Sequence, residues 1–215
     1  ASGVAITGLV AYLIFAMSVT QSVGGGLALT AFGSFMFASA FKWVVIFAPL
    51  ALVFFISARI NAMSLSAAQI SFWAFAALMG ASISSIFLVY TGESMARVFF
   101  ITAASFGGLS LWGYTTSRDL SGWGSFLFMG LIGIIIASLV NIFLKSSGLD
   151  WIISVIGVIV FAGLTAWDTQ KIKEMYSPMD DGTIAGRKAV MGALSLYLDF
   201  INLFLMLLRL FGDRR

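Results

Sequence analysis

The sequence predicts an all-α integral membrane protein: seven transmembrane helices that form a single domain over residues 1–215. Of its 215 residues, 60% are hydrophobic and only 10% are charged, whereas soluble domains typically carry about 25% charged residues. The mean hydropathy is +1.05. Apolar runs of about 20 residues, the length that crosses the hydrocarbon core of a bilayer, also recur along the whole chain.

We find seven such runs, separated by short segments rich in turn residues. They lie near Gly3–Val23, Phe41–Ile60, Ala67–Tyr90, Met95–Tyr114, Phe126–Leu144, Trp151–Trp167 (continuing to about Met175) and Val190–Leu210. The first run is the weakest, because its apolar content thins after Met17. The triplet Gly24 to Gly26 predicts a turn after this run. The turn residues at 177–182 (SPMDDG) predict a short connection before the last one.

Small residues at every fourth position predict where helices pack closely, because they let two backbones approach in lipid. One such series is Ala76, Gly80 and Ser84, and another is Ala104 and Gly108. Pro49 lies inside the second run, where it removes a backbone hydrogen bond and predicts a kink.

The composition excludes several classes of function. The chain has no Cys and no His, which excludes disulfides, thiolate metal sites, Ser-His-Asp catalysis and the HExxH zinc site. The net charge of +3 is too small to indicate nucleic-acid binding. We expect no tightly bound cofactor and no enzymatic activity. The sequence shows no signal peptide, and we expect residues to be missing before Ala1.

Asp168 and Asp199 are the most informative residues, because each lies within a stretch that is otherwise apolar enough to cross a bilayer. A charge at the bilayer centre costs about 2.5 kcal/mol or more, so an intramembrane carboxylate marks a candidate functional site. Both lie roughly 12 to 14 Å from the predicted helix ends. Consecutive helices usually pack antiparallel, so the two carboxyl groups are expected to meet. Helical spacing places Thr165 beside Asp168, and Ser195 and Asn202 beside Asp199, as candidate ion-path or supporting residues.

Two carboxylates in contact do not both ionise at low cost, so we expect the pair to share a proton and to sense pH. When the proton leaves, a cation or a basic side chain must balance the added charge. Calcium prefers oxygen ligands, which makes Asp168 and Asp199 candidate metal ligands for a permeant or transiently bound calcium ion. Alternatively, the two aspartates only hydrogen-bond neighbouring helices. Arg59 either snorkels to the membrane interface or reaches inward as a counter-ion.

The chain also resembles the Bax inhibitor-1 (transmembrane Bax inhibitor motif) family over essentially its whole length. The most specific segment is Gly192–Arg209 (GALSLYLDFINLFLMLLR), supported by AWDTQKI at 166–172 and GGLSLWGYTTSRDLSG at 107–122. The family usually has Tyr before the first aspartate. This chain has Trp167 there, which keeps an aromatic ring but loses the hydroxyl.

The resemblance implies a seven-helix fold in which the other six helices wrap the last one, and a pH-sensitive calcium leak like that of bacterial members. It places the di-aspartyl pH sensor on Asp168 and Asp199 and the basic latch on Arg59. We therefore expect a calcium-permeable channel or leak, multi-pass in a bacterial cytoplasmic (inner) membrane, whose partners are the lipid bilayer, calcium ions and protons.

Within the transport class, a proton-coupled calcium exchanger needs the same carboxylates as a leak and stays open as a variant. Two other classes of function also stay open. The first is a non-transporting regulator that binds a membrane protease or another membrane protein. The second is an intramembrane aspartyl protease, which needs a glycine-rich GxGD approach to its second aspartate. Leu196-Tyr-Leu-Asp199 is bulky and regular instead, which disfavours the protease.

Overall fold

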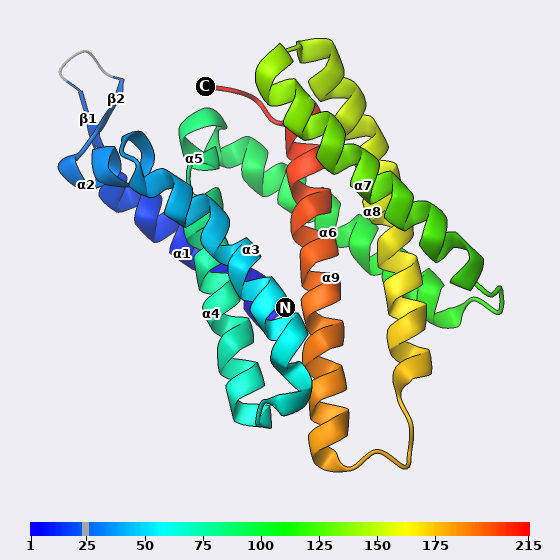
Figure 1. Ribbon diagram of the computed structural model, residues 1–215. Helices are drawn as coiled ribbons and strands as arrows, with labels where there is room; N and C mark the ends of the chain where they lie inside the picture. Colours follow the sequence, from blue (N-terminus) through cyan, green and yellow to red (C-terminus); the bar gives the residue numbers. More distant parts are fainter. Residues whose placement is uncertain (23–25) are drawn as a thin grey trace. The chain divides into compact units, whose positions relative to one another are not determined.

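The computed structural model describes residues 1–22 and 26–215, arranged as two compact units (Figure 1). The first unit comprises Ala1–Thr91 with Arg214–Arg215, and the second comprises Gly92–Asp213. Gly24 and Gly25 of the predicted turn lie outside the described residues. The prediction of one domain over residues 1–215 stays a prediction.

The first unit is helical apart from one short hairpin. Its elements are α1 (Ser2–Ser18), β1 (Val19–Gln21), β2 (Leu27–Leu29), α2 (Ala31–Gly33), a π-helix (Ser34–Ala38), α3 (Phe41–Arg59), a 3-10 helix (Ile60–Ala62), α4 (Leu65–Ile83) and α5 (Ile86–Val89). Strands β1 and β2 pair antiparallel with Val19 opposite Leu29, and α4 packs against both α1 and α3. The run predicted over Ala67–Tyr90 is therefore one span that is interrupted at Ser84 and Ser85.

The predicted seam through Ala76 and Gly80 is confirmed, because it is where α4 meets α1. The Thr7 hydroxyl donates a hydrogen bond of 2.9 Å to the Ala76 carbonyl. A Cβ on Gly80 would lie 2.6 Å from the Thr7 carbonyl oxygen. Glycine is required at this position because the two backbones are too close to admit a side chain.

The predicted seam through Ala104 and Gly108 is wrong. Ala104 and Gly108 are exposed, and no heavy atom of the described chain lies within 4 Å of a Cβ built on Gly108. Helix α6 instead buries Val98 and Thr102. Its close contact is at Gly113, where a Cβ would lie 2.3 Å from the Ala166 carbonyl oxygen.

The second unit consists of four long helices: α6 (Gly92–Thr115), α7 (Ser121–Leu144), α8 (Ser147–Met175) and α9 (Gly182–Phe211). Helix α8 packs against α6, α7 and α9, and α9 also packs against α6. Phenylalanine rings fill the contact between α6 and α9. The ring of Phe106 lies edge-on to that of Phe200, with 5.4 Å between the ring centroids.

The connection from α8 to α9 covers residues 176–181, which confirms the short connection predicted from the turn residues at 177–182. Helix α9 begins at Gly182, well before the apolar run at Val190, since the Asp181 carboxylate accepts the backbone N–H groups of Thr183 and Ile184 and caps the helix. Asp180 forms an ion pair of 2.7 Å with Lys188. The apolar run predicted from Val190 begins later than the helix, because hydropathy marks the membrane-spanning part of a helix and not its polar first turns.

Within the described residues, six helical segments are long and apolar enough to span a membrane. They are Phe41–Ala62, Leu65–Val89, Gly92–Thr115, Ser121–Leu144, Ser147–Met175 and Gly182–Phe211. Helix α1 is apolar but has only 17 residues, about the lower limit for a span. The chain is thus a helical membrane protein, while the count of seven and the central position of α9 stay predictions.

Candidate functional site

Asp168 of α8 and Asp199 of α9 meet inside the second unit, where a hydrogen bond joins their carboxyl groups. Asp199 is 5% exposed. A hydrogen bond between two carboxyl groups requires a proton on one of them, because a carboxylate only accepts. In this arrangement the pair therefore holds at least one proton.

The two carboxyl groups come close because α8 and α9 pack tightly on both sides of the pair. Toward the connection, a Cβ on Gly192 would lie 3.0 Å from the side chain of Ile172. Toward the other end, a Cβ on Gly157 would lie 2.8 Å from Met206. Glycine at these two positions lets the helices approach, so the carboxyl groups between them come within hydrogen-bonding reach.

The polar neighbours predicted to support the pair bond mainly to their own helices. The Thr165 hydroxyl donates to the Phe161 carbonyl at 2.7 Å, and the Asn202 amide donates to the Leu198 carbonyl at 2.8 Å. Ser195 is half-buried. The side chains of Thr165, Ser195 and Asn202 make no hydrogen bond to either carboxyl group in the part of the chain that the structure describes.

One oxygen of the pair is consequently unsatisfied. Asp199 Oδ2 is buried and has no hydrogen-bond partner among the described residues. A buried acceptor in this state costs about 1 to 3 kcal/mol. It is therefore the atom of the pair best placed to take a proton, a water molecule or a cation.

Ser110 is a candidate that the sequence analysis missed. Its hydroxyl is also buried without a partner among residues 1–22 and 26–215. It shares a face of α6 with Phe106 and Gly113, which contact α9 and α8 at Phe200 and Ala166. Ser110 therefore faces the helices that carry the aspartates. A serine within an apolar helix was the available signal, but ordinary packing explains most such residues.

Two basic residues bear on the aspartate pair: Lys171, which interacts with it, and Arg59, which was predicted to do so. Lys171 lies three residues after Asp168 on α8 and interacts with it electrostatically. Arg59 is exposed at the end of α3, in the first unit. Its role as a latch stays a prediction.

Two carboxyl groups offer four oxygens at most, fewer than the six to eight that calcium prefers. Across the described residues, no group of three or more Asp, Glu, His or Cys side chains gathers in a way that could hold a metal ion. Carbonyl oxygens or water would have to complete a calcium shell at Asp168 and Asp199. This donor set fits a passing ion better than a resident one.

Comparisons with known proteins agree with the membrane character of the chain. A family model described as inhibitor of apoptosis-promoting Bax1 matches residues 1–215. The inner membrane protein YbhL of Escherichia coli K12 is 56% identical over 173 residues, which cover 80% of this chain and 74% of YbhL. An uncharacterized protein of Rickettsia prowazekii is 53% identical over 180 residues, or 84% of this chain and 76% of that protein. An uncharacterized protein of Caulobacter vibrioides is 45% identical over 216 residues, which cover all of this chain and 85% of that protein.

Proposed function

The chain belongs to the Bax inhibitor-1 family, and from this membership we propose that it is a pH-sensitive, calcium-permeable leak. It is a multi-pass inner membrane protein, like its relative YbhL, and its environment is the lipid bilayer. The proposal is of a passive path for ions and not of a catalyst.

The observation that carries the proposal is the hydrogen-bonded pair of Asp168 and Asp199 within two membrane spans. Structural ion pairs in a membrane usually combine opposite charges, whereas two facing carboxyl groups are stable together only while they share a proton. Loss of that proton leaves two negative charges side by side. The contact between α8 and α9 then weakens unless a cation enters.

In the proposed cycle, the shared proton holds α8 against α9 at acid pH and the path is closed. At higher pH the proton leaves and the unsatisfied Asp199 Oδ2 becomes part of a doubly charged oxygen site. Calcium, which prefers hard oxygen ligands, is attracted to that site and passes. Arg59 is the proposed basic latch that pairs with a carboxylate when no proton bridges the two.

The test is calcium flux into liposomes that contain the purified protein, measured from about pH 6 to about pH 8, because two carboxyl groups that share a proton respond to pH as a pair. We expect wild-type flux to change with pH and Asp168→Asn and Asp199→Asn to remove that change. Glu174→Gln is the matched control, because Glu174 is an exposed carboxylate on the same helix as Asp168. Its flux should follow the wild type.

Equal calcium flux at both ends of the pH range in the wild type would contradict the gating step. No flux in any variant would contradict the leak itself and would favour the regulator of a membrane partner, such as a membrane protease. Arg59→Gln tests the latch separately. If Arg59 pairs with a carboxylate once the proton has left, the variant differs from the wild type in calcium flux at about pH 8 and matches it at about pH 6.

A further inference from the structure

A second candidate site lies in the second unit, where α8 meets α6 and α7. A cavity of about 230 Å³ opens where the end of α6, the beginning of α7 and the middle of α8 converge. Its lining includes three tryptophans, Trp112, Trp123 and Trp167, together with Arg118 and Gly163. We refer to it as the tryptophan pocket.

The walls of the tryptophan pocket are held in place by hydrogen bonds and close packing. The Gln170 side-chain amide donates to the Arg118 carbonyl at 2.8 Å, and the Leu120 N–H donates to Gln170 Oε1 at 2.8 Å. Gly124 leaves room for the indole of Trp167, since a Cβ there would lie 2.6 Å from the ring. The pocket is thus formed before any ligand binds, which lowers the entropic cost of binding.

Unpaired charge at the pocket is positive. The guanidinium of Arg118 has no hydrogen bond or ion pair with any residue that the structure describes, and the side chain is exposed. Lys171 Nζ lies 4.8 Å from the ring centroid of Trp167. The single acidic residue of the lining, Asp119, accepts the Ser121 N–H at 2.8 Å, and hydrogen bonding to Ser121 holds the pKa of Asp119 below its ordinary value. Because that carboxylate is already engaged at the start of α7, Arg118 remains available for an anion.

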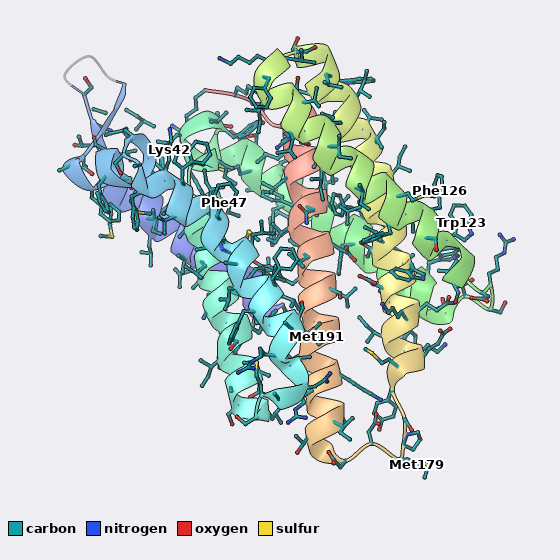
Figure 2. All side chains as sticks on the ribbon, in the orientation of Figure 1. Lys42, Phe47, Trp123, Phe126, Met179 and Met191 are labelled. Atoms are coloured by element: carbon teal, nitrogen blue, oxygen red, sulfur yellow. The ribbon has the colours of Figure 1, made fainter. Side chains whose placement is uncertain are left out.

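The location and the aromatic lining point to a lipid as the source of that anion. The pocket lies at the end of one candidate span, Gly92–Thr115, and at the beginning of the next, Ser121–Leu144. Trp112 and Trp123 are 47% and 61% exposed, and Trp123 and Phe126 project from the first turns of α7 (Figure 2). Tryptophans at span ends sit among lipid headgroups. A small anion in bulk water would make little use of three apolar indole rings. The glycerol and upper acyl carbons of a lipid, in contrast, can pack against them.

We propose that the tryptophan pocket binds the headgroup region of an anionic phospholipid, with Arg118 pairing with the lipid phosphate and the indoles covering the glycerol and first acyl carbons. The volume agrees with this occupant. A cavity of about 230 Å³ is smaller than the roughly 300 to 1,000 Å³ of sites that enclose whole drug-sized molecules. The acyl chains would therefore continue along the helices into the bilayer.

The proposal is tested by native mass spectrometry of the full chain in detergent, titrated with phosphatidylglycerol or with phosphatidylcholine of the same acyl chains. We expect the wild type to bind phosphatidylglycerol about fivefold more tightly, because the choline cation of phosphatidylcholine neutralises its phosphate, whereas a basic residue near a net anionic headgroup contributes roughly 1 kcal/mol. Arg118→Gln should remove this preference. Lys145→Gln, which changes a basic residue at the far end of α7, should keep it.

Two tryptophan variants, one in the pocket and one outside it, test whether the indoles of the pocket contribute to lipid binding. Trp123→Leu should weaken binding of both lipids. Trp151→Leu should not weaken binding, because Trp151 lies in the first turns of α8, roughly 22 Å along the helix from Ala166. It is a matched control because Trp151 is similarly exposed, at 60%. Thermal unfolding of each variant shows that the fold is retained.

Three results would overturn the proposal. The first is equal binding of the two lipids by the wild type. The second is equal loss of binding in Arg118→Gln and Lys145→Gln. The third is displacement of the bound lipid by millimolar inorganic phosphate, which would show a site for free anions. None of these results depends on calcium flux, so the lipid site and the proposed leak are tested independently of each other.

Discussion

Gln170 shows how much one polar side chain can organise in this protein. Gln170 is 7% exposed. Its side-chain amide accepts a hydrogen bond from the Leu120 N–H and donates one to the Arg118 carbonyl, both in the connection between α6 and α7. A backbone N–H that is buried without a partner costs about 1 to 3 kcal/mol. Gln170 thereby fixes the connection on α8 and keeps Arg118 and Leu120 beside Trp167.

We expect Gln170→Leu to lower the free energy of unfolding by about 1 to 3 kcal/mol, because it leaves the Leu120 N–H unpaired. The control is Thr169→Val, since the Thr169 hydroxyl bonds only to the Thr165 carbonyl of its own helix. The control should change stability by less than about 0.5 kcal/mol. Thermal unfolding in detergent measures both. Equal effects of the two variants would show that Gln170 does not fasten the connection.

Asp180 gives a residue-scale prediction for acid pH. Its hydrogen bond and ion pair with Lys188 hold the pKa of Asp180 below the ordinary value of 3.8. A carboxylate whose folded pKa is lowered stabilises the fold fully above its unfolded pKa, and this contribution is lost as pH falls through the folded pKa. The contribution is therefore fully present near neutral pH and decreases as pH falls below about 4 toward the folded pKa.

We expect wild type to be more stable than Asp180→Asn at about pH 6, and the difference to be smaller at about pH 3, because the contribution of the ion pair is lost as pH falls from the unfolded pKa through the lowered folded pKa. The measurement is the unfolding temperature in detergent at both pH values. Asn keeps the side-chain shape, so the comparison isolates the charge. A difference between the two proteins that is the same at both pH values would contradict the assignment to the ion pair.

The sequence identified some site residues and missed others for a physical reason. Asp168 and Asp199 could be predicted because a carboxyl group in a membrane span is costly and therefore rare. Ser110 and Gln170 could not, because serine and glutamine are common at helix surfaces and only the three-dimensional arrangement shows that they are buried. Hydrogen bonding within helices also explains why Thr165 and Asn202, which lie at the predicted spacing, do not reach the carboxyl groups.

At the scale of the elements, hydropathy predicted the spans well and their ends poorly. The apolar run fixes which residues cross a bilayer, but capping residues decide where a helix begins. Ser64 and Ser146 accept backbone N–H groups at the beginnings of α4 and α8, as Asp181 does for α9. The hairpin of β1 and β2 could not be predicted, because three-residue strands carry too short a pattern to distinguish from a loop.

Two glycines of α6 separate close packing from open surface. Gly113→Ala would place a methyl group against the backbone of Ala166, which cannot shift as a side chain can. We expect a loss of about 1 to 3 kcal/mol. Gly108→Ala adds the same atom where nothing of the described chain lies within 4 Å, and it should be neutral or stabilising, since Ala favours helix. Unfolding temperatures compare the two variants, and equal losses would mean that the contact at Gly113 is not tight.

At the scale of the whole molecule, burial is distributed unevenly among the spans. In the apolar stretch of α9, 56% of the residues are buried, and in α8 44%, whereas the value for α7 is 11%. Apolar residues cover buried and exposed surfaces alike, because lipid accepts them on the outside. Hydropathy therefore could not rank the spans by burial, although the polar residues within α8 and α9 indicated that these helices face protein.

This uneven burial predicts which large side chains hold the molecule together. Leu203→Ala should cost about 2 to 5 kcal/mol, because Leu203 is 1% exposed and its loss leaves a cavity. Phe143→Ala removes a larger side chain that is 85% exposed, and it should cost far less, since lipid or detergent fills the space. Unfolding in detergent compares them. A greater loss for Phe143→Ala would reverse the assignment of inner and outer faces.

The six-residue connection between α8 and α9 also bears on how the protein is made. Each of these helices, entering the bilayer alone, would carry a bare carboxylate into hydrocarbon at a cost of about 2.5 kcal/mol or more. Joined by so short a turn, the two leave the ribosome in succession and can insert together as a helical hairpin. The carboxyl groups then enter hydrogen bonded to each other, with one charge instead of two. The same proton that we propose as the gate of the finished protein thus lowers the barrier to its biosynthesis.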